Sequence, residues 1–284
     1  MIDTHMHLVE AGRLSYPWTG DIEELAGKDF SYADYLALTG EKVTASVFME
    51  TAVADEDYQA EAAWVAQLAA DPATGVVGQI ASCRPEEDEG FEAWIEKAVA
   101  GLHAVGFRRI LHVVDDGLSQ TDRFRRNVAY IGRQGGSFDM CFMARQLPIA
   151  AELARSCDDM RLVLDHCGVP DIAADGGRPA EDWRKGVREL ARLEHVACKL
   201  SGIMAYCGPG KASYEAVRPY AEHVIECFGA DRVVWGSDWP VVDQGNGLPD
   251  WISVTERLLQ ELSEDERTKV ETRNAARIYK LGRL

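Results

Sequence analysis

Eight short segments rich in Val, Ile and Phe recur along the chain, separated by longer stretches with the period of an amphipathic helix. The eight segments span residues 1–8, 44–51, 75–82, 106–113, 138–144, 161–167, 196–202 and 232–238. The helical stretches include residues 57–71, 91–106, 181–194 and 214–229. Alternating strands and helices form a parallel sheet, and eight such units close into a barrel. We therefore predict an α/β fold, a single (β/α)8 TIM barrel.

The organisation of the chain favours one domain over residues 1–284, because no repeat, low-complexity tract or Pro/Gly linker interrupts the pattern. The stretch 9–43 is too long for a simple connection, so we expect a long loop after the first strand that covers the barrel mouth. Extra C-terminal helices follow the eighth strand. Ser263 begins the last one, with Glu266 at the spacing of a capping box.

The charge balance disfavours several classes of partner. The chain has 30 Lys and Arg against 47 Asp and Glu, a formal net charge of −17. Such a surface repels nucleic acid and anionic membranes, so we expect neither as a partner.

Neither a membrane-length apolar run nor a secretory signal is visible, which predicts a cytoplasmic protein. The seven scattered cysteines predict reduced core thiols. No feature of the sequence sets the oligomeric state.

Polar residues gather at the carboxyl ends of the predicted strands, where the chemistry of a TIM barrel is located. His5 and His7 lie two residues apart on the first strand, so both should face the barrel interior, with Asp3 below them. Two imidazoles are poor packing material for a buried strand. The pair therefore predicts a functional site at the barrel mouth.

Two later strand ends add candidates. Asp238 stands just before a Trp-Pro break at the end of the last strand, which is hard to explain as a turn residue alone. His166 ends the sixth segment, whereas Asp165 alternates with it and is expected to face the helices or cap the next turn. The predicted catalytic set is His5, His7, His166 and Asp238.

Further inward-facing side chains are candidates for substrate binding. Arg108 and His112 share one face of the fourth segment, and Arg109 points away toward a salt bridge. Arg108 fits either a buried ion pair or a clamp on the substrate. We expect Lys199 to pair with a buried carboxylate, with a Schiff base as the alternative. The candidate substrate-binding residues are Arg108, His112, Trp18, Glu50, Lys199 and Trp239, of which the tryptophans lie in loops where rings stack on sugars.

Seven ordered blocks, IDTHMHL, LSYPW, GFRRILH, LVLDHCGVP, CKLSGI, WGSDWP and NAARIYKL, span nearly the whole chain. Together they resemble the amidohydrolase superfamily, in the branch of sugar lactonases and 2-pyrone-4,6-dicarboxylate lactonases. The resemblance implies that Asp238 acts as general base on water while the histidines and an arginine polarise a lactone carbonyl. Two-metal members need a carboxylated lysine after strand four and a histidine after strand five, and this chain has neither.

Several alternatives stay open. His5, His7, His166 and Asp238 could hold one divalent ion, zinc first, so the expected cofactor is none or a single metal. Of the arginines that surround a pyrone dicarboxylate in that branch, only Arg108 has a counterpart here. This favours a small neutral or singly charged substrate such as a fuconolactone-like aldonolactone. The other candidates are a mononuclear metal hydrolase or decarboxylase, a pyrone-dicarboxylate-type lactonase, a lactone isomerase and a non-catalytic binding protein.

Overall fold

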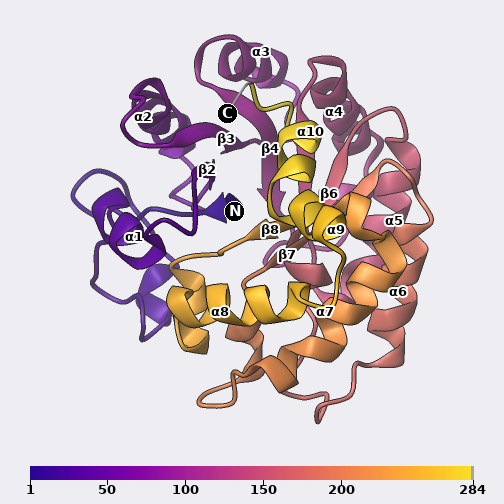
Figure 1. The fold of residues 1–284 in the computed structure, drawn as a ribbon. Helices are drawn as coiled ribbons and strands as arrows, with labels where there is room; N and C mark the ends of the chain where they lie inside the picture. Colours follow the sequence, from indigo (N-terminus) through magenta and orange to yellow (C-terminus); the bar gives the residue numbers. More distant parts are fainter. Residues whose placement is uncertain (283–284) are drawn as a thin grey trace.

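The computed structural model describes residues 1–282 and contains one eight-stranded parallel sheet whose strands pair in sequence order (Figure 1). The strands are β1 (Ile2–Met6), β2 (Ala45–Met49), β3 (Val76–Ser82), β4 (Ala104–Ile110), β5 (Ser137–Cys141), β6 (Leu162–Leu164), β7 (Val196–Ser201) and β8 (Val233–Gly236). Backbone hydrogen bonds from Asp238 N to His5 O and from His7 N to Trp239 O, both 2.8 Å, join β8 to β1. Each predicted segment overlaps a strand, although β4 and β5 begin two residues and one residue before the predicted starts, and the (β/α)8 barrel is confirmed.

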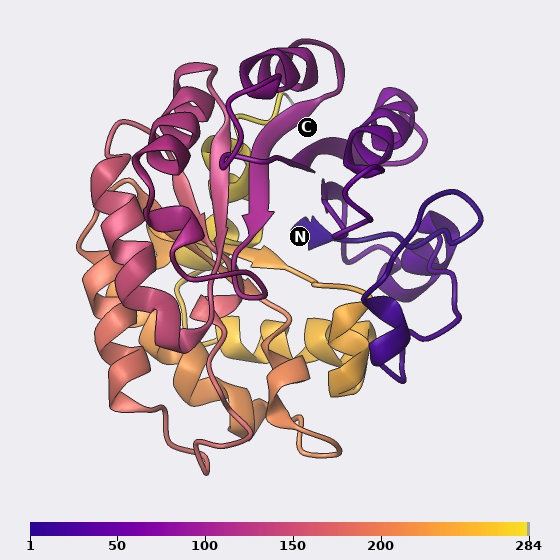
Figure 2. The same ribbon diagram turned by 180° about the vertical axis from the view of Figure 1, so that it is seen from behind.

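Most of the α-helices surround this ring of strands (Figures 1 and 2). They are α1 (Tyr32–Thr39), α2 (Tyr58–Ala70), α3 (Phe91–Gly101), α4 (Asp122–Arg133), α5 (Leu147–Ser156), α6 (Glu181–Ala191), α7 (Tyr214–Phe228), α8 (Leu248–Leu259), α9 (Glu264–Thr268) and α10 (Asn274–Ile278). The predicted capping box at Ser263 is present. The helix predicted over 91–106 ends earlier, because β4 already begins at Ala104. None of these helices is long and apolar enough to cross a membrane.

The long loop after β1 is present and precedes α1. The Trp18 indole Nε1 donates to the Thr51 carbonyl at 2.8 Å, and Ala54 N donates to the Ser15 carbonyl at 2.9 Å. The loop therefore lies against the segment that follows β2, at the carboxyl ends of the first two strands.

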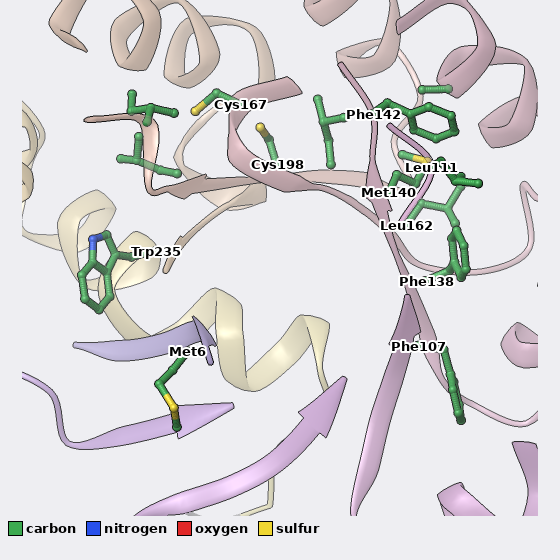
Figure 3. Packing of buried hydrophobic residues seen from close by; sticks show 14 of the residues in the cluster. Met6, Phe107, Leu111, Phe138, Met140, Phe142, Leu162, Cys167, Cys198 and Trp235 are labelled. Carbon is green, nitrogen blue, oxygen red and sulfur yellow. The ribbon is translucent and has the colours of Figure 1, made fainter. Parts of the chain in front are cut away.

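The hydrophobic core has an outer and an inner part. Between the sheet and the helices, Phe107, Phe138 and Trp235 point outward from the strands and are fully buried (Figure 3). Each such side chain contributes about 1.5–3 kcal/mol by leaving water. Inside the barrel, inward-facing residues, several of them at or near the start of their strands, pack with Ile278 and Tyr279. The C-terminal helix α10 thus closes the amino-terminal end of the barrel. The seven cysteines are free thiols, as expected.

A β-bulge corrects the expectation for Asp3. The register of β1 against β2 shifts between Asp3 and Met6. An extra residue in a strand breaks strict side-chain alternation. Asp3 consequently turns toward α1, where the Tyr35 hydroxyl donates to its Oδ2 at 2.7 Å. It does not lie below His5 and His7 on the inner face.

Candidate active site

Four side chains that lie far apart in the sequence meet at the carboxyl end of the barrel. His5 and His7 come from β1, His166 from the short turn after β6, and Asp238 from the end of β8. The Nε2 atoms of His5 and His7 lie 3.6 and 3.4 Å from Asp238 Oδ1. His166 Nδ1 lies 3.6 Å from Asp238 Oδ2. The structure thus brings together the four residues predicted as catalytic, each at most 5% exposed.

The contact between His7 and Asp238 requires a proton or a cation between the two groups. His7 Nδ1 lies 2.9 Å from the Met49 carbonyl oxygen, which only accepts hydrogen bonds, so Nδ1 carries a proton. In a neutral ring, Nε2 then presents its lone pair to Asp238 Oδ1, which is also an acceptor. Two acceptors at this distance need a proton or a metal ion between them. The site is therefore built either for a proton shared between His7 and Asp238 or for a bound cation between them.

Asp238 is held in an unusual backbone conformation with one oxygen free. Its φ is +58°, in the left-handed region that costs on the order of 1–3 kcal/mol for a residue other than glycine. Its carbonyl accepts from Val242 N at 2.9 Å. Among residues 1–282 its Oδ2 has no hydrogen-bond partner although it is buried. Strain at a buried acid with an unpartnered oxygen is typical of a reactive carboxylate.

His166 is also placed by a left-handed backbone, with φ of +51°. Its Nδ1 lies 2.9 Å from Ser201 Oγ, a residue that sequence reasoning did not include in the site. Burial lowers the pKa of His166, so its imidazole is neutral at pH 7. Ser201 could have been found from the two-residue period, because it shares the inward face of β7 with Lys199.

A buried charge cluster lies directly beneath these residues. Lys199 Nζ is 2.6 Å from Asp139 Oδ2 and 3.1 Å from Asp165 Oδ1, and all three residues are fully buried. The predicted pairing of Lys199 with a carboxylate is thus confirmed. The expectation that Asp165 faces the helices is wrong, because Asp165 continues the inward face of Val163, two residues before it.

Burial acts on the pKa values of this cluster, and the neighbouring charges oppose or reinforce it. Burial and the Lys199 charge together hold the pKa of His5 well below its usual value. Burial alone would raise the pKa of Asp165, but the Lys199 charge together with His5 and His166 outweighs it and keeps that pKa well below the usual range. For Asp139 burial wins over Lys199 and raises the pKa to about 6. Asp165 therefore keeps its negative charge at neutral pH.

Arg108 and Glu50, both candidates for substrate binding, bind each other. Arg108 Nε donates to Glu50 Oε1 at 2.6 Å, and Nη2 donates to the Glu50 carbonyl at 2.7 Å. Burial alone would raise the pKa of Glu50, but the Arg108 guanidinium and the backbone N–H of Ala52 together outweigh it and lower that pKa. Of the two interpretations of Arg108, the buried ion pair matches the structure. Arg109 points away and pairs with Glu86 at 2.7 Å, as expected.

The remaining candidates lie around the mouth. His112 is partly exposed, with Nδ1 3.1 Å from Cys141 Sγ, and burial lowers its pKa to about 4. Trp18 is partly buried in the loop after β1. Trp239 is only 1% exposed, and its ring packs against Phe30 and Tyr35 with centroids 5.5 and 5.7 Å apart. This packing covers the ring of Trp239, so it offers no open face for stacking on a sugar.

Comparison with known proteins places this constellation in a family. The model of the amidohydrolase family matches residues 2–281. The chain belongs to the amidohydrolase family. An L-fucono-1,5-lactonase of Burkholderia multivorans is 31% identical over 298 residues, covering 99% of this chain and 96% of the relative. A 2-pyrone-4,6-dicarboxylate hydrolase of Comamonas testosteroni is 28% identical over 159 residues, 53% of this chain and 50% of that protein.

A solved amidohydrolase shares the fold over the whole length. The crystal structure of an amidohydrolase from Burkholderia multivorans with bound zinc superposes with a TM-score of 0.87 at 28% identity, covering 99% of both chains. In the present amidohydrolase, one nitrogen each of His5 and His7 and one oxygen of Asp238 lie within 4.8 Å of one another. Two imidazoles and a carboxylate are a donor set that suits zinc. The converging acceptors at His7 and Asp238 fit such an ion.

Proposed function

We propose that this amidohydrolase hydrolyses the lactone of a sugar acid. The observation that carries the proposal is the buried Asp238 carboxylate, whose Oδ1 faces His5 and His7 while its Oδ2 has no partner among residues 1–282. An acceptor oxygen without a partner beside a neutral imidazole is what a general base for water requires. The full-length similarity to an L-fucono-1,5-lactonase supports a lactone as the electrophile.

The chemistry needs one proton acceptor and one proton donor. Asp238 Oδ2 takes a proton from water as the water oxygen bonds to the lactone carbonyl carbon. The proton or cation held between His7 and Asp238 would stabilise the carbonyl oxygen as it becomes negative. The bond between the carbonyl carbon and the ring oxygen then breaks, and the ring oxygen takes up the proton. His166, 3.6 Å from Asp238 Oδ2, is placed to take part in this proton transfer.

The paired cations favour a substrate with little negative charge. Arg108 is engaged by Glu50, and at neighbouring strand ends Arg84 pairs with Asp55 at 2.6 Å. Arg145 likewise pairs with Asp116. A dicarboxylate needs cations that are free to bind it. This supports a neutral aldonolactone over a pyrone dicarboxylate.

We further propose that His5, His7 and Asp238 bind one divalent ion, with zinc preferred, and that His166 lies beside it. When bound, such an ion polarises a carbonyl oxygen or lowers the pKa of a bound water. The ion would lie between the two facing acceptors, His7 Nε2 and Asp238 Oδ1. Without an ion, a proton shared by these two groups takes its place.

The proposed activity is tested by measuring proton release as the protein acts on a panel of lactones. It should include neutral six-carbon aldonolactones, their 6-deoxy forms and a pyrone dicarboxylate, assayed with the purified protein with and without added zinc. We expect neutral aldonolactones to be opened faster than the dicarboxylate. A folded protein that releases no acid from any lactone under either condition would refute the proposal, and a new lactone without acid release would indicate isomerisation.

A further inference from the structure

The turn that follows β6 has a left-handed backbone over four consecutive residues. Their φ angles are +51° at His166, +55° at Cys167, +73° at Gly168 and +44° at Val169. Residues other than glycine adopt this region as single residues and rarely as a run, because the Cβ crowds the backbone. Val169 is the least suited of the four, since it is β-branched and precedes Pro170, which disfavours helical backbone in the residue before it. Such a turn persists only where surrounding groups hold it.

The handedness of this turn decides where His166 points. Asp165 continues the inward face of Val163, so regular alternation would direct His166 toward the helices. The left-handed turn instead places His166 Nδ1 2.9 Å from Ser201 Oγ and 3.6 Å from Asp238 Oδ2. Relaxation of the turn to right-handed backbone would therefore take the imidazole away from Asp238.

The carbonyl groups of the turn show what holds it. The His166 carbonyl accepts from Val169 N at 3.0 Å. The next carbonyl, that of Cys167, would find its donor three residues on, but Pro170 has no N–H. The Trp183 indole, near the start of α6, supplies the donor instead, with Nε1 2.9 Å from the Cys167 oxygen, and Trp183 is only 2% exposed. Because a buried carbonyl without a donor is unfavourable, this bond favours the turn as it stands.

We propose that Trp183 is a positioning residue for His166, because its hydrogen bond to the Cys167 carbonyl holds the left-handed turn that directs the imidazole toward Asp238. The purpose of the arrangement rests on the proposed function, in which His166 takes part in proton transfer beside Asp238. The turn and its hydrogen bond belong to the folded protein, so their test needs neither substrate nor metal.

A second tryptophan provides a matched control. Trp94 Nε1 donates to the Ser82 carbonyl at 3.0 Å, at the end of β3, which carries none of the four predicted catalytic residues. Trp94 and Trp183 are both at most 4% exposed. Each ring also packs against a tyrosine, with centroids 5.2 Å apart for Trp183 and Tyr220 and 5.5 Å for Trp94 and Tyr58. Substitution by phenylalanine therefore removes the same indole donor from similar surroundings.

The experiment determines crystal structures of Trp183→Phe and Trp94→Phe and measures kcat on a lactone that the wild type opens. Trp183→Phe should lose the left-handed turn and the contact between His166 and Asp238. Its kcat should fall at least about 10-fold, since displacing a catalytic group by about 1 Å has effects of up to about 100-fold. Trp94→Phe should keep both the turn and kcat. A Trp183→Phe structure with the left-handed turn intact and His166 beside Asp238 would overturn the proposal, whether or not any lactone is hydrolysed.

Val169→Gly tests the strain separately, because glycine adopts positive φ without the Cβ penalty. Added to Trp183→Phe, it should restore the turn and raise kcat again, which a general loss of stability would not explain. Alone, it should keep or raise the thermal unfolding midpoint, whereas Val43→Gly, at a half-buried loop position without positive φ, should lower it. A folded double variant without the restored turn would overturn the proposal. Equal losses of midpoint in the two glycine variants would do so even if Trp183→Phe does not fold.

Discussion

Gly202 lies directly against Asp238, so closely that a Cβ added to the glycine would stand 2.2 Å from Asp238 Oδ2. Gly202 follows β7 and has a φ of +56°, a conformation that glycine adopts without strain. The loop after β7 therefore sets the position of the carboxylate that follows β8.

Gly202→Ala should lower kcat for lactone hydrolysis by at least about 10-fold, since displacing a catalytic group by about 1 Å has effects of up to about 100-fold. The kinetics are compared with those of Gly210→Ala, which has a similar φ of +65° but open space around the added carbon. Both variants should lose stability, and Gly210→Ala should keep its kcat. Equal losses of kcat in the two variants would contradict this steric explanation.

Asp238→Asn should reduce kcat by about 100-fold or more, the usual effect of losing a general base, while the thermal unfolding midpoint changes little. Asp243→Asn, in the following turn and outside the cluster, serves as the control. The assay is steady-state hydrolysis with circular dichroism to monitor folding. An Asp238→Asn protein with wild-type kcat would remove Asp238 from the role of base.

Glu50→Gln should lower the free energy of unfolding by about 3–5 kcal/mol, because it leaves the buried Arg108 charge without its main partner. Urea denaturation measures the change. Glu86→Gln breaks the more exposed pair with Arg109 and should cost about 1 kcal/mol. If both substitutions cost the same, the Arg108 pair does not carry the stability assigned to it.

Zinc should stabilise the metal-free protein against unfolding by about 2.7 kcal/mol when its free concentration is about 100 times the Kd. The readout is the unfolding midpoint as a function of zinc concentration. His7→Gln should abolish the shift, whereas His195→Gln, whose ring contacts the Ala154 carbonyl away from the site, should retain it. A wild type without any shift would contradict the proposed zinc site.

Acidification should destabilise the protein through His112. The unfolded histidine has a pKa of 6.5 and the folded one about 4, so below pH 6.5 the unfolded chain binds a proton that the folded chain does not. Stability from this group is present above pH 6.5 and is lost as the pH falls to about 4. The amount is on the order of 3 kcal/mol. In urea titrations, His112→Gln should lose correspondingly less stability between pH 7 and pH 4; an unchanged loss would exclude His112.

The sequence predicted the barrel and the four clustered residues because both follow from periodicity. Strand and helix periods identify the βα units, and the fold rule then brings His5, His7, His166 and Asp238 to one end. The charge cluster beneath them follows no such rule. Asp139 is a lone acid within an apolar strand, a signal that could have been noticed.

Two departures from strict alternation account for the main errors. The bulge in β1 turned Asp3 outward, and the left-handed backbone after β6 brought His166 to the site although Asp165, next to it, holds the inward position of the strand. Trp239 was misplaced for another reason, since a loop position predicts exposure and its ring instead packs against α1. Such local backbone choices depend on tertiary contacts that a single sequence does not display.

Tyr279, just after α10, donates its hydroxyl proton to Asp139 at 3.0 Å, and Asp139 shares Lys199 with Asp165. A continuous chain of hydrogen bonds and ion pairs therefore connects Tyr279, at the amino-terminal end of the barrel, to Asp165 beside His5. Replacing or shortening the chain from α10 onward would remove the hydrogen bond from Tyr279 to Asp139. It would thereby change the charge distribution beneath the candidate site without altering any residue of the site itself.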